Sequence, residues 1–426
     1  MHYDETTLDA VRTALVVTLQ IVLPILGAAV VIGLLISILQ SVTQIQDQTI
    51  SFVECGDTLS PVHVATIAKW EEANPGWKVA PEVVGWGQCQ DKVTTLAVAG
   101  TPVGLAYIGS RALKQLASND LIVPMPMTDE EKASYYNYVA DTVTFDGTQW
   151  GRPVAFSTKA LYWNKDLFTA AGLDPEKPPT TWAEEIADAK AITEKTDAAG
   201  FGLVAKTFDN TMHQFLHWVY TNNGSVIDAD GKITLDSPQN LAALEAYKEL
   251  VPYSEEGPTA YEQNEVRAIF LDGKIGMIQA ASGTRGLLAD AKFKWGVTTL
   301  PLGPDAKGPG TLLITDSMAV FKNTGYEDKA MDLAKFLTNP ENQSAYEAEQ
   351  GLTPLRPGPA VDALVSADPN WKPFLDSIQY GGPEPLLTDY VGLQNSMIEM
   401  VQSVVTGAAE PQAALTKAAG ELEAFK

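Results

Sequence analysis

The sequence predicts an α/β protein of two lobes, preceded by one apolar N-terminal helix. Three observations lead to this prediction. Short apolar segments alternate with helical segments, which is typical of parallel sheets with helices on both faces. The chain has 426 residues, more than the roughly 250–300 that one hydrophobic core serves. Residues 151–168 hold two extended runs with no turn between them, which indicates a crossing from one lobe to the other.

Charge and cysteine content exclude several classes of protein. The formal net charge of −24 argues against partners bound through phosphates, because such partners need a basic surface. We therefore expect no nucleic acid as a partner. The chain has only two cysteines, Cys55 and Cys89, which excludes a disulfide scaffold and a zinc site of four cysteines. One bridge or two free thiols remain open.

The N-terminal segment is apolar over a length that fits a lipid bilayer. Residues 14–39 are almost wholly apolar, and roughly 20 residues suffice to cross the hydrocarbon core. A cleaved signal peptide fits badly, because Asp4, Glu5 and Asp9 precede the apolar run and no small-x-small site follows it. The alternative is a buried core helix, but such helices are usually about 10–14 residues long. We expect a transmembrane helix at residues 14–39, whose orientation cannot be read because no lysine precedes Lys69.

Two motifs mark the same part of the chain, GLLISILQ at residues 33–40 and TQIQDQTISF at residues 43–52. With the acidic start, they make residues 1–52 similar to the first half of the FliQ family, which consists of small two-helix membrane proteins of flagellar and type III export. This resemblance implies a membrane component of a protein-export apparatus. The family's second membrane helix is replaced by a different sequence, so a fusion or chimaeric product is the plainer interpretation.

From residue 49 the chain alternates strands and helices. Strands are expected at residues 49–55, 77–85 and 105–108, each followed by a helix. Ligands of parallel sheets bind beyond the carboxyl ends of the strands. The residues at that edge are Asp57, Thr58, Trp86, Gln88, Gly109, Ser110 and Arg111.

The second half of the chain is expected to return to the first lobe. A helix capped by Thr180-Thr181, with Glu184 or Glu185 as the acid of a capping box, follows the crossing. A second crossing is expected at residues 281–283, after which residues 296–300 and 317–321 add strands to the first lobe. The resulting division is residues 1–48, a first lobe of 49–156 with 283–325, and a second lobe of 157–282 with 326–426.

Several motifs follow one another in a fixed order through this region. They are AVAGTP (97–102), AYIGSRALKQLASNDLIVPM (106–125), ALYWNKDLFTAAGL (160–173), PPTTWAEEIADAKAI (178–192), FLDGKIGM (270–277), AKFLTNPENQ (334–343) and GLTPLR (351–356). Together they make residues 49–426 similar to family 1 extracellular solute-binding proteins, the maltose-binding-like class of ABC sugar importers. The resemblance implies a type II periplasmic-binding-protein fold, in which two Rossmann-like lobes joined by hinge strands close on a ligand by hinge bending.

The same resemblance implies a function. We expect a sugar or oligosaccharide as ligand, an ABC importer permease as partner, no cofactor and no enzymatic activity. The two-lobe domain would be periplasmic or extracellular and held at the cell membrane by the N-terminal helix.

The resemblance also implies a set of ligand contacts. They are Asp57, Thr58, Trp86, Gln88, Ser110, Arg111, His213, Gln214, Ser282, Gly283 and Tyr380. Aromatic faces suit the C–H surfaces of a sugar and planar polar side chains suit its hydroxyls, and such pockets lie between lobes. Gly104 and Cys89 depart from the family's pattern, which often has Asp and an aromatic residue at these places. Cys55 and Cys89 follow neighbouring strands in such a fold, so a bridge is conceivable, although free thiols are slightly favoured.

Other chemistries have weaker support in the sequence. His213 and His217 are four residues apart and share a helix face, but no HExxH motif and no third zinc ligand at a recognisable spacing accompany them. We therefore expect no metal site. The chain has no GxSxG elbow and no Walker loop. A glycosidase would need two carboxylates across a cleft, which spacing alone does not exclude, but the two-lobe pattern accounts for the same residues without catalysis.

Overall fold

A computed structural model describes most of the chain. The described residues are 9–20, 22–24, 26–27, 30, 32, 48–228 and 230–426. The chain divides into a first unit of Met1–Thr49 with Ala73–Lys78, and a second unit of Ile50–Glu72 with Val79–Lys426.

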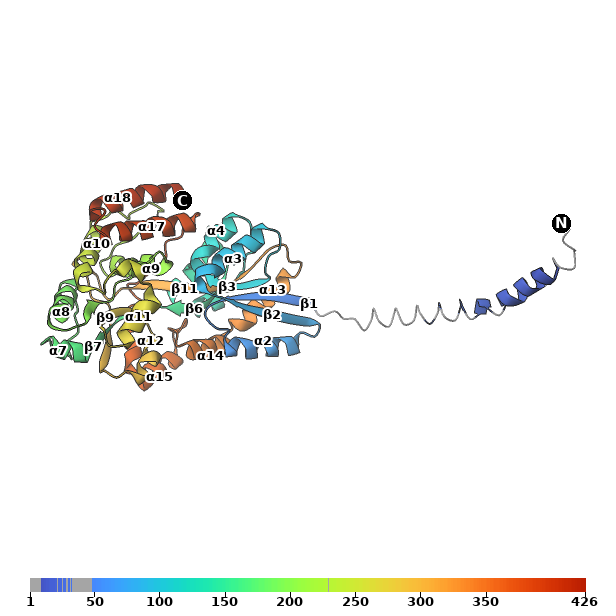
Figure 1. The fold of residues 1–426 in the computed structure, drawn as a ribbon, viewed down its shortest axis with the longest axis horizontal. Coiled ribbons are helices and arrows are strands. Elements are labelled where there is room, and N and C mark those ends of the chain that lie inside the picture. Colours follow the sequence, from blue (N-terminus) through green and yellow to red (C-terminus); the bar gives the residue numbers. More distant parts are fainter. Residues whose placement is uncertain are drawn as a thin grey trace. The chain divides into compact units, whose positions relative to one another are not determined.

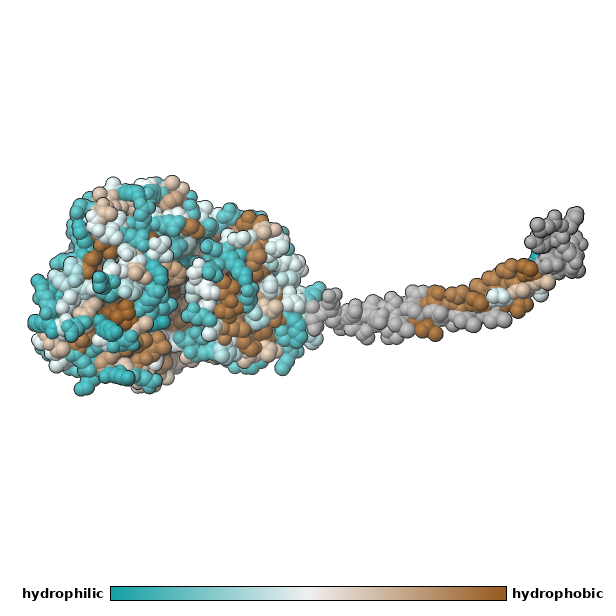
Figure 2. All heavy atoms as spheres, viewed as in Figure 1, coloured by the Kyte–Doolittle hydropathy of each residue, from teal (hydrophilic) through white to brown (hydrophobic). Residues whose placement is uncertain are grey.

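The N-terminal unit presents an apolar helical surface. Its described residues between 9 and 32 are helical, and they include large hydrophobic side chains that are exposed, among them Leu15, Leu19 and Leu23. Figure 2 shows hydrophobic residues in brown along the described part of this segment. Among the described residues, none of the helices combines the length and the apolar character that crossing a membrane requires. Much of the expected membrane helix at residues 14–39 lies outside the described residues.

The first sheet is mixed and has the strand order β12-β11-β3-β1-β2, with β6 also paired to β11. Its strands are β1 (Gln48–Cys55), β2 (Trp77–Val84), β3 (Leu105–Gly109), β6 (Arg152–Ser157), β11 (Leu312–Val320) and β12 (Gly382–Pro383). β1 and β3 run parallel, whereas β11 runs antiparallel to both β3 and β6. A hairpin of β4 (Thr144–Phe145) and β5 (Thr148–Gln149) precedes β6.

The second sheet has the strand order β10-β7-β9-β8. Its strands are β7 (Lys159–Asn164), β8 (Ala199–Phe201), β9 (Ile275–Ala281) and β10 (Trp295–Thr298). β8 and β9 are parallel, and β7 runs antiparallel to β9 and β10. Buried side chains of the first sheet, such as Val53 and Ile108, lie in one hydrophobic cluster, and those of the second sheet lie in two others. Leu312 of β11 packs with one of the clusters of the second sheet.

The expected crossing between the sheets is confirmed. β6 pairs with β11 in the first sheet and β7 pairs with β9 in the second, and only Thr158 separates the two strands. Thr158 is fully buried, and its hydroxyl donates a hydrogen bond to the carbonyl of Phe374 at 3.1 Å. The chain therefore passes from one sheet to the other within a single residue.

The strand expected at residues 296–300 joins the second sheet, so its predicted place in the first lobe is wrong. β10 pairs with β7 of the second sheet, where Trp295 faces Asn164, so the chain returns to the first sheet later than predicted, at β11. Gly296 makes this pairing possible, because a Cβ added there would lie 2.2 Å from the Trp163 ring. The expected strand at residues 317–321 is confirmed within β11, which pairs with β3.

Helices surround both sheets (Figure 1). The first part of the chain contributes α2 (Pro61–Ala73), α3 (Trp86–Val98), α4 (Leu113–Ser118), α5 (Asp129–Ala133) and α6 (Asn137–Asp141). The middle contributes α7 (Lys165–Ala170), α8 (Trp182–Lys195), α9 (Asp209–Tyr220), α10 (Pro238–Leu250), α11 (Gln263–Leu271) and α12 (Thr284–Leu287). The last part contributes α13 (Glu327–Leu337), α14 (Pro340–Gln350), α15 (Pro359–Ala367), α16 (Lys372–Asp376), α17 (Tyr390–Val405) and α18 (Pro411–Leu422).

Local sequence signals set several helix ends. The predicted capping box at α8 is confirmed: the Thr181 hydroxyl accepts from the Glu184 backbone N–H, and Glu184 is its acid. Ser237 caps α10 and Asn339 caps α14 in the same manner, with proline at the first helical position of each.

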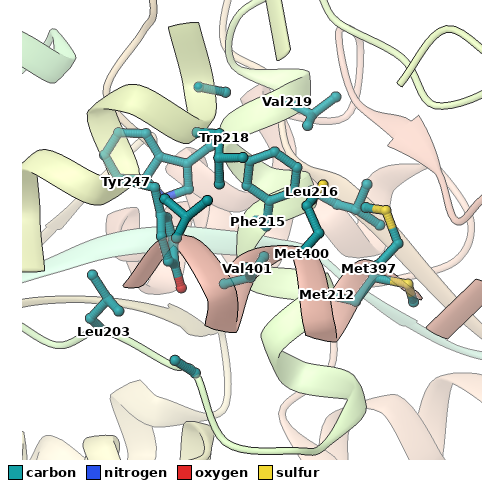
Figure 3. Packing of buried hydrophobic residues seen from close by; sticks show 14 of the residues in the cluster. Leu203, Met212, Phe215, Leu216, Trp218, Val219, Tyr247, Met397, Met400 and Val401 are labelled. Carbon is teal, nitrogen blue, oxygen red and sulfur yellow. The ribbon is translucent and has the colours of Figure 1, made fainter. Parts of the chain in front are cut away.

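The helix α9 lies at the centre of the largest hydrophobic cluster. Figure 3 shows Met212, Phe215 and Trp218 of this helix among side chains from α10 and α17. Trp218 and Tyr247 meet edge to face, with ring centroids 6.0 Å apart. Because nearly every side chain of α9 is buried, the helix is held in one position, and the polar residues of its first turns are held with it.

A buried acid in α8, Glu185, should make the stability of the fold depend on pH. It is fully buried in α8, and within the described part of the chain neither carboxylate oxygen has a hydrogen-bond partner. Burial raises its pKa well above the ordinary value, with a smaller contribution from Asp188. The folded protein therefore holds a proton that the unfolded chain releases, so stability is full below the ordinary pKa and is lost as pH rises toward the raised one.

Glu185→Gln should abolish this loss, because an amide does not ionise. We expect the variant to be more stable than the wild type at pH 8 and nearly equal to it at pH 4, with the gap growing by about 1.4 kcal/mol per pH unit until the raised pKa is reached. Urea unfolding at both pH values measures the difference. The matched control is Glu184→Gln, which removes an exposed capping acid and should not stabilise the protein at pH 8. A stability difference between Glu185→Gln and the wild type that is the same at both pH values would contradict the prediction.

Candidate functional site

The site begins at the carboxyl end of β3. This strand ends at Gly109, and a short 3-10 helix, Ser110–Ala112, follows it. The Arg111 side chain folds back over the end of the strand, so a Cβ added at Gly109 would lie 2.4 Å from its Nη1 atom. Glycine at position 109 therefore leaves the space that the guanidinium group occupies.

Arg111 is 3% exposed and forms ion pairs with three carboxylates. Its Nη2 lies 3.1 Å from Oδ2 of Asp209, and its Nη1 lies 3.4 Å from Oε2 of Glu384 and 3.5 Å from Oδ1 of Asp316. His213 Nε2 forms a hydrogen bond with the other oxygen of Glu384. We call these five residues the Arg111 cluster.

The cluster joins the two sheets. Asp316 belongs to β11 and Glu384 directly follows β12, so both extend from the first sheet, as does Arg111. Asp209 and His213 lie in the first half of α9, whose apolar side chains pack in the cluster around the second sheet. The ion pair between Arg111 and Asp209 therefore connects the first sheet to α9.

Burial and neighbouring charges change the pKa values in the Arg111 cluster. Burial raises the pKa of Asp316 to about 7, against the opposing effect of Arg111. Burial acts on Glu384 in the same direction, but Arg111 and His213 outweigh it and lower its pKa. Burial lowers the pKa of Arg111. Glu384 and the other acidic neighbours outweigh this effect and raise the pKa well above the ordinary value, so the guanidinium group stays charged. Near neutral pH, the Arg111 cation thus faces the ionised carboxylate of Glu384 and the partly protonated carboxyl group of Asp316.

Aromatic side chains lie beside the Arg111 cluster. Trp86 is the first residue of α3, and its ring lies 5.8 Å from Cζ of Arg111 and 5.8 Å, edge to face, from the ring of Tyr107. The Tyr107 hydroxyl donates to Asp316 at 3.4 Å. On the other side, the Phe208 ring lies 3.4 Å from the Cβ position of Gly87. Aromatic walls with a few convergent polar groups are typical of small-molecule pockets.

A small cavity of about 10 Å³ adjoins Arg111. It is lined by Ser110, Arg111, Thr142, Leu313, Thr315, Pro383, Glu384 and Leu386. Nε of Arg111 and Oγ1 of Thr315 are buried without a hydrogen-bond partner among the residues that the structure describes. The cavity has about the size of one water molecule, so these polar atoms adjoin a space that a single small polar group would fill.

Several predicted contacts lie in or beside the Arg111 cluster, and others are exposed in neighbouring segments of the chain. Trp86, Arg111 and His213 take part directly, and the hydroxyl of Ser110 lies 2.6 Å from that of Ser317 on β11. Asp57 and Thr58 are exposed in the loop after β1, and Gln88 is exposed in the first turn of α3.

The remaining predicted contacts have partners elsewhere. Gln214 points into the core, where its Oε1 accepts hydrogen bonds from the Val204 backbone at 2.7 Å and from the Tyr247 hydroxyl at 2.6 Å. Ser282 donates to the carbonyl of Gly351 at 2.7 Å, and Gly283 is exposed next to it. Tyr380 is 41% exposed and lies over Gly308.

Three cluster members were not among the predicted contacts. Asp209 precedes His213 by four residues and so shares its helix face, a spacing that could have pointed to it. Asp316 interrupts an apolar strand, which is also a visible signal. Glu384 carries no such signal, because it follows a two-residue strand far from the other members in the sequence.

His213 and His217 do not converge on one ion. His217 is buried, and its Nδ1 accepts a hydrogen bond from the Leu312 backbone at 3.0 Å. Burial lowers its pKa well below the ordinary value, so its ring is neutral near pH 7. In the described ranges, no group of three or more His, Cys, Asp or Glu side chains could hold a metal ion.

The expectation of free thiols is wrong. Cys55 and Cys89 form a disulfide with a Cα–Cα distance of 5.5 Å. Cys55 ends β1 and Cys89 lies in the first turn of α3, directly after the neighbouring strand β2, so both sulfur atoms reach the same end of the sheet. The bond links the loop that carries Asp57 to the turn that carries Trp86.

Removal of this disulfide should destabilise the protein. The bond links two cysteines that are 34 residues apart in the sequence. In the chain-entropy model, a cross-link that closes a loop of that length stabilises the folded protein by about 3–4 kcal/mol. Replacing both cysteines with serine should lower the free energy of unfolding in urea by that order. Treating the wild type with a reductant should give the same loss, whereas the reductant should leave the double variant unchanged. Equal stability of oxidised and reduced wild type would contradict the prediction.

Comparisons with known proteins place the chain in a family. Residues 65–373 match the family profile described as bacterial extracellular solute-binding protein, and residues 6–54 match that of bacterial export proteins, family 3. A chain of Brucella abortus (strain 2308) named as a binding protein is 27% identical, over 93% of this chain and 98% of that protein. The sn-glycerol-3-phosphate-binding periplasmic protein UgpB of Salmonella paratyphi A is 28% identical, over 67% of this chain and 68% of its own.

Solved structures share the fold. An ABC transporter solute-binding protein from Thermotoga lettingae, bound with α-D-tagatose, superimposes with a TM-score of 0.78 at 23% identity, covering 89% of this chain and 99% of that one. Maltose-bound MalE3 of T. maritima gives a TM-score of 0.76 at 22% identity, covering 89% and 100%. The two-lobe α/β architecture is therefore that of solute-binding proteins, and because the family profile spans most of the chain, this protein belongs to the bacterial extracellular solute-binding protein family.

Proposed function

We propose that this protein is the substrate-binding component of an ABC importer. It captures a sugar or oligosaccharide between its two lobes and delivers it to a membrane permease, without catalysing a reaction. The observation that carries the proposal is the position of Trp86 beside the Arg111 cluster, where residues of both sheets meet. An aromatic face next to convergent carboxylate and guanidinium groups suits the C–H surface and the hydroxyls of a sugar.

The relatives support the class of ligand. The names of the solved structures state tagatose, maltose, mannobiose and ribitol as bound molecules, all of them polyhydroxylated. The two lobes would close on such a ligand by bending near Thr158, where the chain crosses between sheets. We assign residues 49–157 with β11 to the first lobe, and residues 159–298 with α17 and α18 to the second.

The disulfide favours an oxidising compartment for the two-lobe domain. Structural disulfides persist in oxidising environments such as the periplasm and the cell exterior, and they are rare in the cytosol. Cys55 and Cys89 are both almost fully buried, as expected of a bond that stabilises the fold. The two-lobe domain would therefore be periplasmic or extracellular.

A change at Trp86 tests the proposed site. Calorimetry against a panel of mono- to tetrasaccharides should find at least one ligand for the wild type. Trp86→Ala should bind that ligand roughly tenfold more weakly, a loss of about 1.4 kcal/mol, because an aromatic face of the site is removed. Trp86→Phe should retain most of the affinity.

Trp295→Phe is the matched control, since this tryptophan lies on β10 of the second sheet. If no saccharide in the panel binds to the wild type, the sugar assignment is wrong.

The exposed apolar N-terminal helix supports attachment to the membrane. Its large hydrophobic side chains are about half exposed, as in Leu15 at 57% and Leu23 at 60%, and such a surface is stable where lipid or another apolar partner covers it. The alternative is that residues 6–54 derive from a protein-export component by fusion, which the match to the bacterial export family favours.

Charged substitutions in this helix test the attachment. Arginine at both Leu15 and Leu23 should move the protein from the membrane fraction to the soluble fraction, because arginine near a bilayer centre costs about 2.5–3.5 kcal/mol per residue. Val98→Arg is the control, since Val98 is also an exposed hydrophobic residue but lies in α3, and its substitution should leave the distribution unchanged. Retention of the double variant at the membrane would contradict the anchor.

A further inference from the structure

The Arg111 cluster contains more negative than positive charge. Arg111 is the guanidinium group at this place, and all three of its partners, Asp209, Asp316 and Glu384, are acids. The imidazole of His213 is engaged by Glu384, and His217 is neutral. The positive charge of Arg111 is thus already matched by the protein's own carboxylates.

Lys159 does not reverse this balance. It lies at the start of β7, and burial together with Arg267 lowers its pKa to about 8, although Asp209 and Glu262 oppose this. Its ammonium group is therefore only partly charged at mildly basic pH, and the nearest acids that stabilise the charge are again residues of the protein itself.

The N-terminus of α9 at the site also carries an acidic side chain. The N-terminus of a helix attracts phosphates and carboxylates, because its backbone N–H groups and dipole favour negative charge. In α9 the first residue is Asp209, so the first turn of the helix already carries a carboxylate of the chain. An anionic ligand at this end would be repelled by that carboxylate.

The same carboxylates remain accessible as acceptors. The side chains of Asp209 and Asp316 are 12% and 14% exposed, and Trp86 beside them is half-buried. Carboxylate oxygens accept hydrogen bonds from hydroxyl groups and repel phosphate oxygens. Within the cluster, Nε of Arg111 is the donor left without a partner among the described residues.

We propose that this site accepts polyhydroxylated ligands that carry no anionic group and rejects their phosphorylated counterparts. The inference rests on the proposed function and deepens it, because it selects among the ligands that the family transports. It separates this chain from its UgpB relatives, whose name states sn-glycerol 3-phosphate, although the two are 28% identical.

Matched ligand pairs test the inference. Calorimetry on the full chain, in a detergent without a sugar headgroup, would compare glucose with glucose 6-phosphate, maltose with maltose 6′-phosphate, and glycerol with sn-glycerol 3-phosphate at pH 8. We expect at least one neutral member to bind and its phosphorylated partner to bind at least 100-fold more weakly. Equal or tighter binding of a phosphorylated member would overturn the inference while leaving a solute receptor. If no member of any pair binds but the saccharide panel yields a ligand, the inference fails and the proposed function stands. If neither the pairs nor the panel yield a ligand, both fail.

Variants of the acids test the cause. Asp209→Asn and Asp316→Asn each keep the side-chain shape and remove one negative charge. The affinity for the neutral member of a pair, divided by the affinity for its phosphorylated partner, should therefore fall at least tenfold. Glu399→Gln, at the surface contact between α17 and α18, should leave the ratio unchanged. Thermal unfolding of each variant identifies any that does not fold, and either acid variant alone suffices. Equal weakening of both members of a pair, with the ratio intact, would show a purely structural role and overturn the inference.

Discussion

The buried guanidinium group of Arg111 is the interaction on which the arrangement of the site depends. A charge removed from water is stable only where it is paired, and losing one partner of such a group typically costs about 3–5 kcal/mol. Here the partners come from β11, from the segment after β12 and from α9, which are far apart in the sequence. A single side chain therefore holds the end of the first sheet against the helix that belongs to the second. The glycine before it, Gly109, leaves the room for this contact.

The fold was largely predictable because its signals are local. The alternation of strands and helices, the capping box at Thr181 and the two apolar runs on either side of Thr158 are all read within a few residues. The sheet to which a late strand belongs is not local information. Strand β10 could have joined either sheet by its sequence, and its contact with β7 depends on the fit of Gly296 against Trp163.

The candidate site was predictable only in part, for the same reason. Trp86 and Arg111 follow strands in the order of the sequence, and the topology of a parallel sheet places them at one edge. Asp316 and Glu384 come from strands that join the sheet much later in the chain, so their position depends on the complete fold. The pairing of Cys55 with Cys89 is a similar case, since the spacing alone left both oxidation states open.

The long strand β11 also has a consequence for the time at which the protein folds. It pairs with β3 and β6, whose residues precede it by roughly 150 to 200 positions, and it carries Asp316. Contacts of such long range form late, because the loop between them must close first. The first sheet thus lacks β11 until about three quarters of the polypeptide has been synthesised, while the apolar N-terminal segment has long emerged from the ribosome. In a chain built in this order, any process that acts on the N-terminal segment meets a polypeptide whose first sheet has not yet formed.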